Sequence, residues 1–140
     1  MKLSLKKLLA KILEYISEDN TNHVLWTGGY YMNASQKITL SEPVSSQKHG
    51  IVLVWSGYSD STVHDWNWQF QFVPKWFTKY VGVGDGFYFI GRCGNLNSTK
   101  LSSKYVYLSS DTTITGHASN TASGTNFDNS LLVLRAVIGV

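Results

Sequence analysis

The adjacent residues His64 and Asp65 are the part of the sequence that most resembles a catalytic site. An imidazole can act as a general base, and Asp60 lies nearby in the same segment. Hydrolysis also needs a nucleophile and a group that orients the base. Neighbouring residues of a strand point to opposite faces, so the sequence alone does not bring His64 and Asp65 together. Polysaccharide hydrolysis is therefore a remote alternative, and no catalytic residue is assigned.

The other reactive side chains indicate neither a metal site nor a redox site. Four histidines are spread along the chain without the short spacings of a zinc site: His23, His49, His64 and His117. Cys93 is the only cysteine, which excludes an intrachain disulfide and predicts a buried, unreactive thiol. The glycines of residues 82–86 do not have the spacing of a phosphate-binding loop. We expect no metal and no cofactor.

Saccharide binding requires fewer assumptions than catalysis. A sugar ring needs an exposed aromatic side chain for its apolar face and a few polar groups for its hydroxyls. The sequence has both kinds of residue at predicted strand ends and loops. For each aromatic residue, partial burial with a bonded polar tip is the structural alternative. The candidate ligand-binding residues are Tyr58, Asp60, His64, Asp65, Trp76, Tyr80, His117 and Asn120.

Residues 66–72 alternate strictly between aromatic and amide side chains. A period of two predicts a β-strand with the aromatic side chains on one face and the amides on the other. The aromatic face comprises Trp66, Trp68, Phe70 and Phe72, and the amide face comprises Asn67, Gln69 and Gln71. Four large aromatics on one face are typical of a core. We therefore predict that the aromatic face is buried and that the amides lie on a polar or intersubunit face.

Short apolar or alternating runs, separated by Gly, Ser, Asn and Asp, continue to the end of the chain. They are residues 24–27, 30–33, 37–41, 51–56, 66–73, 86–91, 104–109, 112–115 and 131–140. This pattern predicts an all-β fold, an antiparallel β-sandwich or jelly-roll-like domain over residues 20–140. Residues 51–55 are apolar on both faces, which predicts a central strand covered on each side, or on one side by another subunit. Residues 74–80 are expected to form a helical turn or an ordered loop.

Residues 3–18 have the only helical pattern in the sequence, within an N-terminal segment over residues 1–19. The apolar seam is formed by Leu5, Leu9, Ile12 and Ile16. A seam of fewer than three heptads is short for an isolated coiled coil. Because Glu14 and Glu18 end the polar face, self-association or docking is favoured over binding to a membrane surface.

The composition fits one soluble domain. Of the 140 residues, 43% are hydrophobic and 15% are charged, which suits a β-rich domain with polar loops. The net charge of +3 is concentrated near the N-terminus, so nucleic acid is not an expected partner. Lys11 interrupts the first apolar run and no cleavage site follows, which argues against a signal peptide. No run is long enough to span a membrane. We expect a protein made in the bacterial cytoplasm.

A series of short motifs can be followed along the β part of the chain. In order, they are Leu25-Trp26, Tyr31-Met32, residues 38–41, residues 50–56, residues 72–75, residues 104–107, residues 114–117 and the terminal residues 133–140. Together they resemble the C-terminal domain of tail-fibre and baseplate proteins from bacteriophages and prophages of Gram-positive bacteria. The resemblance covers residues 24–140, and it depends on the order of the motifs.

In that family the domain is typically the distal tip of a longer chain, is often trimeric and is thought to contact the host surface. The resemblance therefore implies a non-enzymatic protein of the virion tail and a homotrimer. Its implied partners are other phage tail proteins and a host cell-surface saccharide or protein. The alternative is a purely structural or assembly protein of the virion. This chain has only a short helix where relatives have long attachment regions, so either the helix is the attachment device or the chain is a small accessory virion protein.

Overall fold

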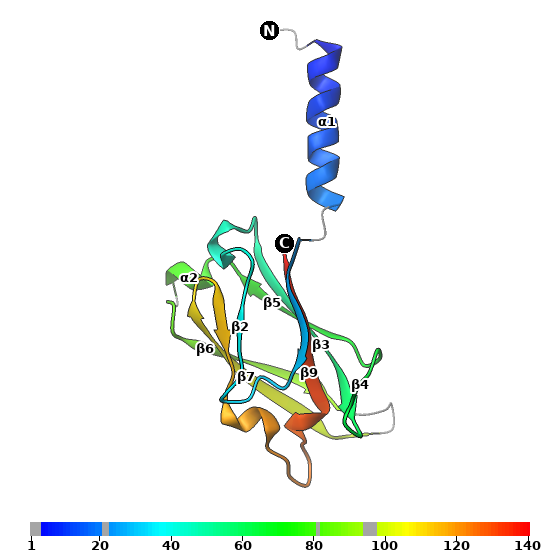
Figure 1. The fold of residues 1–140 in the computed structure, drawn as a ribbon, viewed down its shortest axis with the longest axis vertical. Helices are drawn as coiled ribbons and strands as arrows, with labels where there is room; N and C mark the ends of the chain where they lie inside the picture. Colours follow the sequence, from blue (N-terminus) through cyan, green and yellow to red (C-terminus); the bar gives the residue numbers. More distant parts are fainter. Residues whose placement is uncertain (1–3, 21–22, 81, 94–97) are drawn as a thin grey trace.

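The computed structural model describes residues 4–20, 23–80, 82–93 and 98–140. Two antiparallel sheets follow an N-terminal helix, which confirms the predicted sandwich-like, mostly β fold (Figure 1). The first sheet contains β1 (His23–Tyr30), β3 (Gly50–Ser59), β4 (Thr62–Val63), β5 (Gln69–Pro74) and β9 (Leu132–Gly139). The second contains β2 (Lys37–Thr39), β6 (Gly86–Arg92), β7 (Leu101–Ser110) and β8 (Thr113–Thr115).

The N-terminal helix α1 (Leu5–Asn20) projects from the end of the sandwich at which β1 begins (Figure 1). Ser4 caps the N-terminus of α1, because its hydroxyl accepts a hydrogen bond from the backbone N–H of Lys7. The apolar side chains of α1 are exposed, among them Leu5, Leu9 and Ile12. The side chain of Ile16 lies outside the described part of the chain. The described part of the predicted stripe, Leu5, Leu9 and Ile12, is thus uncovered in the single chain.

The central strands of the first sheet are β9 and β3. β9 pairs with β1 on one side and with β3 on the other, and β3 also pairs with β5. Ile51, Leu53 and Trp55 of β3 point inward and are fully buried. Val52 and Val54 point outward and are half-buried, so in the single chain β3 is covered on one face only. The outer face of this sheet, which we call the outer apolar face, consists of Val24, Val52, Val54, Phe70, Phe72, Ala136 and Ile138.

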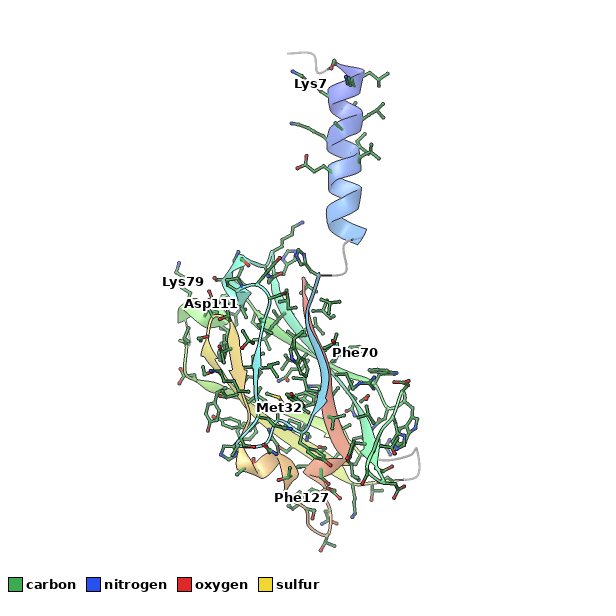
Figure 2. The ribbon with its side chains drawn as sticks, viewed as in Figure 1. Lys7, Met32, Phe70, Lys79, Asp111 and Phe127 are labelled. Carbon is green, nitrogen blue, oxygen red and sulfur yellow. The ribbon has the colours of Figure 1, made fainter. Side chains whose placement is uncertain are left out.

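The core lies between the two sheets, and Figure 2 shows Met32 inside it. Its fully buried members alternate along the strands with outward-facing residues, as a two-layer fold requires. They include Met32, Ile38, Ile51, Leu53, Trp55, Val106, Leu108, Ile114, Leu134 and Val137. Phe89 of β6 stacks on Trp55 with ring centroids 6.0 Å apart, which joins the second sheet to the first.

The aromatic side chains of residues 66–72 are exposed, so the prediction that they lie in the core is wrong. Trp66 and Trp68 are each 43% exposed, while Phe72 is 55% and Phe70 is 65% exposed. Figure 2 shows Phe70 at the surface of the sandwich. The strand also begins later than predicted, at Gln69, because Asn67 has a left-handed backbone with φ of 57°. The alternation is real from residue 69 onward, but the inward, half-buried face is the amide face.

The amides point inward because they bind the backbone of β6 at the place where the two sheets meet. Gln69 accepts a hydrogen bond from the N–H of Arg92 at 2.9 Å and donates to the carbonyl of the same residue at 2.8 Å. Asn67 donates to that carbonyl too, and Gln71 donates to the carbonyl of Tyr88. We call this set the amide clamp. A Cβ at residue 91 would lie 2.2 Å from the Gln69 Oε1 atom, so Gly91 makes room for the clamp.

Short helical segments connect the strands. They are η1 (Val44–Ser46), α2 (Phe77–Tyr80), η2 (Ala118–Thr121) and η3 (Asn129–Leu131). The helical turn expected within residues 74–80 is present as α2. Gly82 and Gly84 have positive φ angles of 107° and 101°, which glycine tolerates better than other residues.

A charged residue, Lys104 of β7, lies within the core with 1% of its surface exposed. Its Nζ atom donates to three backbone carbonyls, those of Tyr31, Asn120 and Asn129. Burial lowers the pKa of Lys104 to about 7, while the neighbouring Cys93 and Asp128 act in the opposite direction. Cys93 is buried as predicted, and burial raises the pKa of its thiol. The Lys104 side chain therefore links β7 to the segments that contain Tyr31, Asn120 and Asn129.

Candidate functional site

The β3–β4 hairpin positions the first residues of the candidate site. Tyr58 pairs with Val63 and Ser59 pairs with Thr62, leaving a two-residue turn of Asp60 and Ser61. Both turn residues have positive φ angles, 51° and 58°, which is the geometry of a type I′ hairpin. The chain then turns back over β3, because the N–H of Gly57 donates to the carbonyl of Trp66 at 3.0 Å. This return places residues 64–68 against the end of the first sheet.

Trp66 lies flat against the protein between a glycine and a histidine. A Cβ at Gly57 would be 2.6 Å from Cζ3 of the Trp66 ring, so a larger residue there would displace the indole. His64 stacks on Trp66 with ring centroids 4.4 Å apart and an angle of 16°. The Nε2 atom of His64 and the hydroxyl of Ser59 are 2.8 Å apart. These contacts fix the orientation of both rings.

Arg135 of β9 holds the neighbouring groups together. Its guanidinium donates to the Ser56 hydroxyl at 2.9 Å and to the backbone carbonyl of His64 at 3.1 Å. It also forms an ion pair with Asp65 at 3.1 Å and lies 5.1 Å from the centre of the Trp68 ring. We call His64, Asp65, Trp66, Trp68 and Arg135 the tryptophan cluster. Two indoles, an imidazole and an ion pair thus meet at one surface.

The tryptophan cluster combines the groups that recognise sugars. Trp66 is packed between Gly57 and His64, whereas the half-exposed ring of Trp68 can stack on the apolar face of a pyranose ring. The side chain of Asp65 is 83% exposed, so its carboxylate can accept hydrogen bonds from sugar hydroxyls while it pairs with Arg135. Because the backbone and Arg135 already hold these groups, little ordering is needed on binding.

His64 and Asp65 do not form the catalytic pair that their adjacency suggests. His64 bonds Ser59, whereas the Asp65 carboxylate binds Arg135. A serine nucleophile is activated by a histidine that a third group orients. The Asp65 carboxylate pairs with Arg135, so it does not orient the imidazole of His64 in this arrangement.

Tyr58 and Asp60 lie beside the tryptophan cluster without belonging to it. The ring of Tyr58 meets that of Tyr31 edge-on at 4.9 Å. Burial and the hydrogen bond with Tyr58 raise the pKa of Tyr31 to about 12. Asp60 is exposed at the tip of the hairpin.

Trp76 and Tyr80 lie far from the tryptophan cluster. Trp76 precedes α2 and is 53% exposed, and Tyr80 ends α2 with a side chain outside the described part of the chain. Figure 1 places α2 and β4 at opposite ends of the domain. The candidate residues predicted from the sequence therefore do not form a single site.

The prediction of a ligand contact at Asn120 is wrong, because its side chain is fully buried. Its amide donates to the carbonyls of Met32 and Tyr105, and its oxygen accepts a hydrogen bond from the N–H of Tyr105 at 2.7 Å. The side chain has a structural role. His117 is half-buried, and its Nδ1 atom accepts a hydrogen bond from the N–H of Ser119 at the start of η2.

Sequence reasoning missed Arg135 and assigned Trp66 and Trp68 to the core. One signal could have identified Arg135: it is a charged residue within the otherwise apolar run of residues 131–140. A charge in such a run needs polar partners, which here are Ser56, Asp65 and a backbone carbonyl.

The described residues contain neither a grouped set of metal ligands nor a membrane-spanning helix. Among the described residues, no three His, Cys, Asp or Glu side chains are grouped to hold a metal ion. Within the same ranges, no helix has the length and apolar character needed to cross a membrane. No protein-family model matches the chain, and no curated protein matches it significantly.

Proposed function

We propose that this protein is a non-enzymatic component of a bacteriophage tail or baseplate that binds a saccharide on the host cell surface. The order of motifs along residues 24–140 supports the phage origin. The tryptophan cluster supports saccharide binding, and it is the observation that carries the proposal. It has two half-exposed indoles beside a solvent-facing carboxylate and an arginine.

The exposed stripe of α1 supports self-association through the N-terminal helix. Leu5, Leu9 and Ile12 lie on one side of α1 and contact water in the single chain. A bundle of three such helices would cover these side chains and present three β domains together. A homotrimer would also multiply a weak affinity for a repeated cell-surface saccharide.

Binding of the full-length chain to purified Gram-positive cell walls and to a bacterial glycan array tests the proposal. We expect Trp68→Ala to weaken binding by about tenfold, equivalent to ~1.4 kcal/mol, because a stacking surface is removed. Trp76→Ala is the matched control, since Trp76 is an exposed tryptophan at the other end of the domain. Absence of binding to every wall and glycan would refute the receptor-binding role.

An assembly role is the second candidate, and the outer apolar face favours it. Phe70 and Phe72 of β5 are exposed and pair with the half-buried Val54 and Val52 of β3, which joins four apolar side chains into one surface. A purely structural virion protein would use this surface against another tail protein. Retention of cell-wall binding by Phe72→Ser, with loss by Trp68→Ala, would favour the saccharide-binding role over the assembly role.

A further inference from the structure

A second group of aromatic side chains lies on the outer face of the second sheet. Tyr88 of β6 is directly opposite Tyr105 of β7, and their ring centroids are 4.4 Å apart. Tyr107 meets Tyr105 edge-on at 4.9 Å. His117, which follows β8, lies 5.3 Å from Tyr105 and 6.0 Å from Tyr107. We call these four residues the tyrosine platform.

Packing of the core does not account for the tyrosine platform. Lys104, Val106 and Leu108 of β7 point inward and are buried, so Tyr105 and Tyr107 between them point outward. Tyr88 is 69% exposed. The outer face of an antiparallel sheet is ordinarily polar. Cross-strand aromatic pairs stabilise a sheet, and four rings at such a place also form an aromatic surface on which a ligand can stack.

The rings are held in place before any ligand arrives. A Cβ at Gly86 would lie 2.4 Å from both Cζ and the hydroxyl of Tyr105, so this glycine allows the phenol ring to lie across β6. The imidazole of His117 is fixed by Ser119, whose hydroxyl is 2.7 Å from Nδ1. The backbone N–H of Tyr105 is held by the buried Asn120. Such preorganisation lowers the entropic cost of binding.

A carboxylate, that of Asp85, acts on Tyr105 and disfavours an anionic ligand at this part of the platform. Desolvation raises the pKa of Tyr105, and the neighbouring Tyr107, Tyr88 and Asp85 raise it further. The phenol of Tyr105 is therefore neutral at physiological pH, and its hydroxyl can both donate and accept hydrogen bonds. The chemistry suits neutral or amino sugars better than phosphate-bearing chains.

We propose that the tyrosine platform is a second carbohydrate-binding surface, which stacks the apolar faces of neutral or amino-sugar pyranose rings. It lies on a different sheet from the tryptophan cluster and uses none of its residues. Tyr88, Tyr105 and Tyr107 provide the stacking surfaces, and their hydroxyls with the His117 imidazole provide the polar contacts. Two separate surfaces would let one chain hold two segments of a cell-wall polysaccharide.

Nuclear magnetic resonance of the full-length protein with labelled tyrosine rings tests the proposal. The probes are maltohexaose, the hexamer of N-acetylglucosamine, and polysaccharide released from Gram-positive cell walls. We expect saturable shifts of the Tyr88, Tyr105 and Tyr107 ring signals with at least one probe. Tyr88→Ala should weaken the binding by about tenfold. Gly86→Ala, which keeps every ring but displaces Tyr105, should also weaken it.

Ile90→Ala is the matched control, because Ile90 is 66% exposed on the same face of β6 as Tyr88. The indole N–H signals of Trp66 and Trp68, followed in the same titrations, report on the tryptophan cluster separately. Tyrosine shifts that persist in Trp68→Ala support the platform even if the proposed tryptophan site fails. Absence of tyrosine shifts with all three probes overturns the proposal. Shifts that follow protein concentration alone also overturn it and assign the surface to self-association.

Discussion

Arg135 shows how one side chain organises a surface made from distant parts of the chain. It donates to the Ser56 hydroxyl and to the carbonyl of His64, pairs with Asp65, and packs on Trp68. A planar guanidinium can serve several partners at fixed angles, whereas the ammonium of lysine is a single charged point on a flexible stem. The orientation of the tryptophan cluster therefore depends on arginine at this position.

We predict that Arg135→Ala lowers the free energy of unfolding by about 2 kcal/mol, because two acceptors lose a charged donor. Asp65→Asn should lower it by less than about 0.5 kcal/mol, since the ion pair is largely open to solvent. Equilibrium unfolding in urea measures both values. Equal losses in the two variants would show that the ion pair is the main contribution.

Among the structural elements, β5 is the one whose two faces have opposite roles from those expected. Its amide side chains bind the β6 backbone, and its phenylalanine side chains face solvent. The side-chain amide of Gln69 takes the place of water at the backbone N–H and at the backbone carbonyl of Arg92. Removing it leaves a backbone donor and acceptor without this partner, whereas shortening Phe70 removes little buried surface.

Gln69→Ala is therefore predicted to lower the free energy of unfolding by about 1–3 kcal/mol. Phe70→Ser should change it by no more than about 0.5 kcal/mol, as for most exposed positions. Thermal or urea unfolding compares the two, and hydrogen exchange at the Arg92 amide should accelerate in Gln69→Ala. A larger loss for Phe70→Ser would restore the view that the aromatic face belongs to a core.

The interior of β7 predicts a dependence of stability on pH. The folded pKa of Lys104, about 7, is below its ordinary value of 10.5, so between these pH values the unfolded chain binds more protons. The free energy of unfolding should therefore rise as the pH increases from 7 to 9. The nearby Cys93, with its raised pKa, opposes this trend above the pKa of the unfolded thiol.

Lys104→Met, which replaces the lysine by an unbranched side chain that does not titrate, should reduce that rise. Urea unfolding of both proteins between pH 7 and 9 measures the difference. An unchanged slope in Lys104→Met would mean that Lys104 keeps its ordinary pKa in the fold.

The sequence predicted the elements better than their surroundings. Turn residues and alternation located most strands, and the apolar spacing located α1, because these signals are local. Parity divided residues 66–72 into two faces, but only tertiary packing decides which face is buried. Here the inner face meets the backbone of β6, so amides are better buried than tryptophan. Arg135 and Trp68 are distant in sequence, and no local pattern could bring them together.

At the scale of the whole molecule, the exposed apolar stripe of α1 is the surface that we propose for self-association. We predict that the full chain is a homotrimer and that Ile12→Asp dissociates it, because a charge would be buried without a partner. Lys11→Asp, on the polar side of the helix, is the control and should remain trimeric. Sedimentation velocity measures the mass of each protein. A wild-type chain that stays monomeric at high concentration would contradict the prediction.

The amide clamp has a consequence for a domain displayed in several copies. An edge strand with free backbone groups invites pairing with the sheet of a neighbouring molecule and then polymerisation. At β6, polar groups of Tyr88 and Arg92 that face away from β7 are already bonded to glutamine side chains. Crowded copies of the domain are therefore hindered from pairing through the β6 edge.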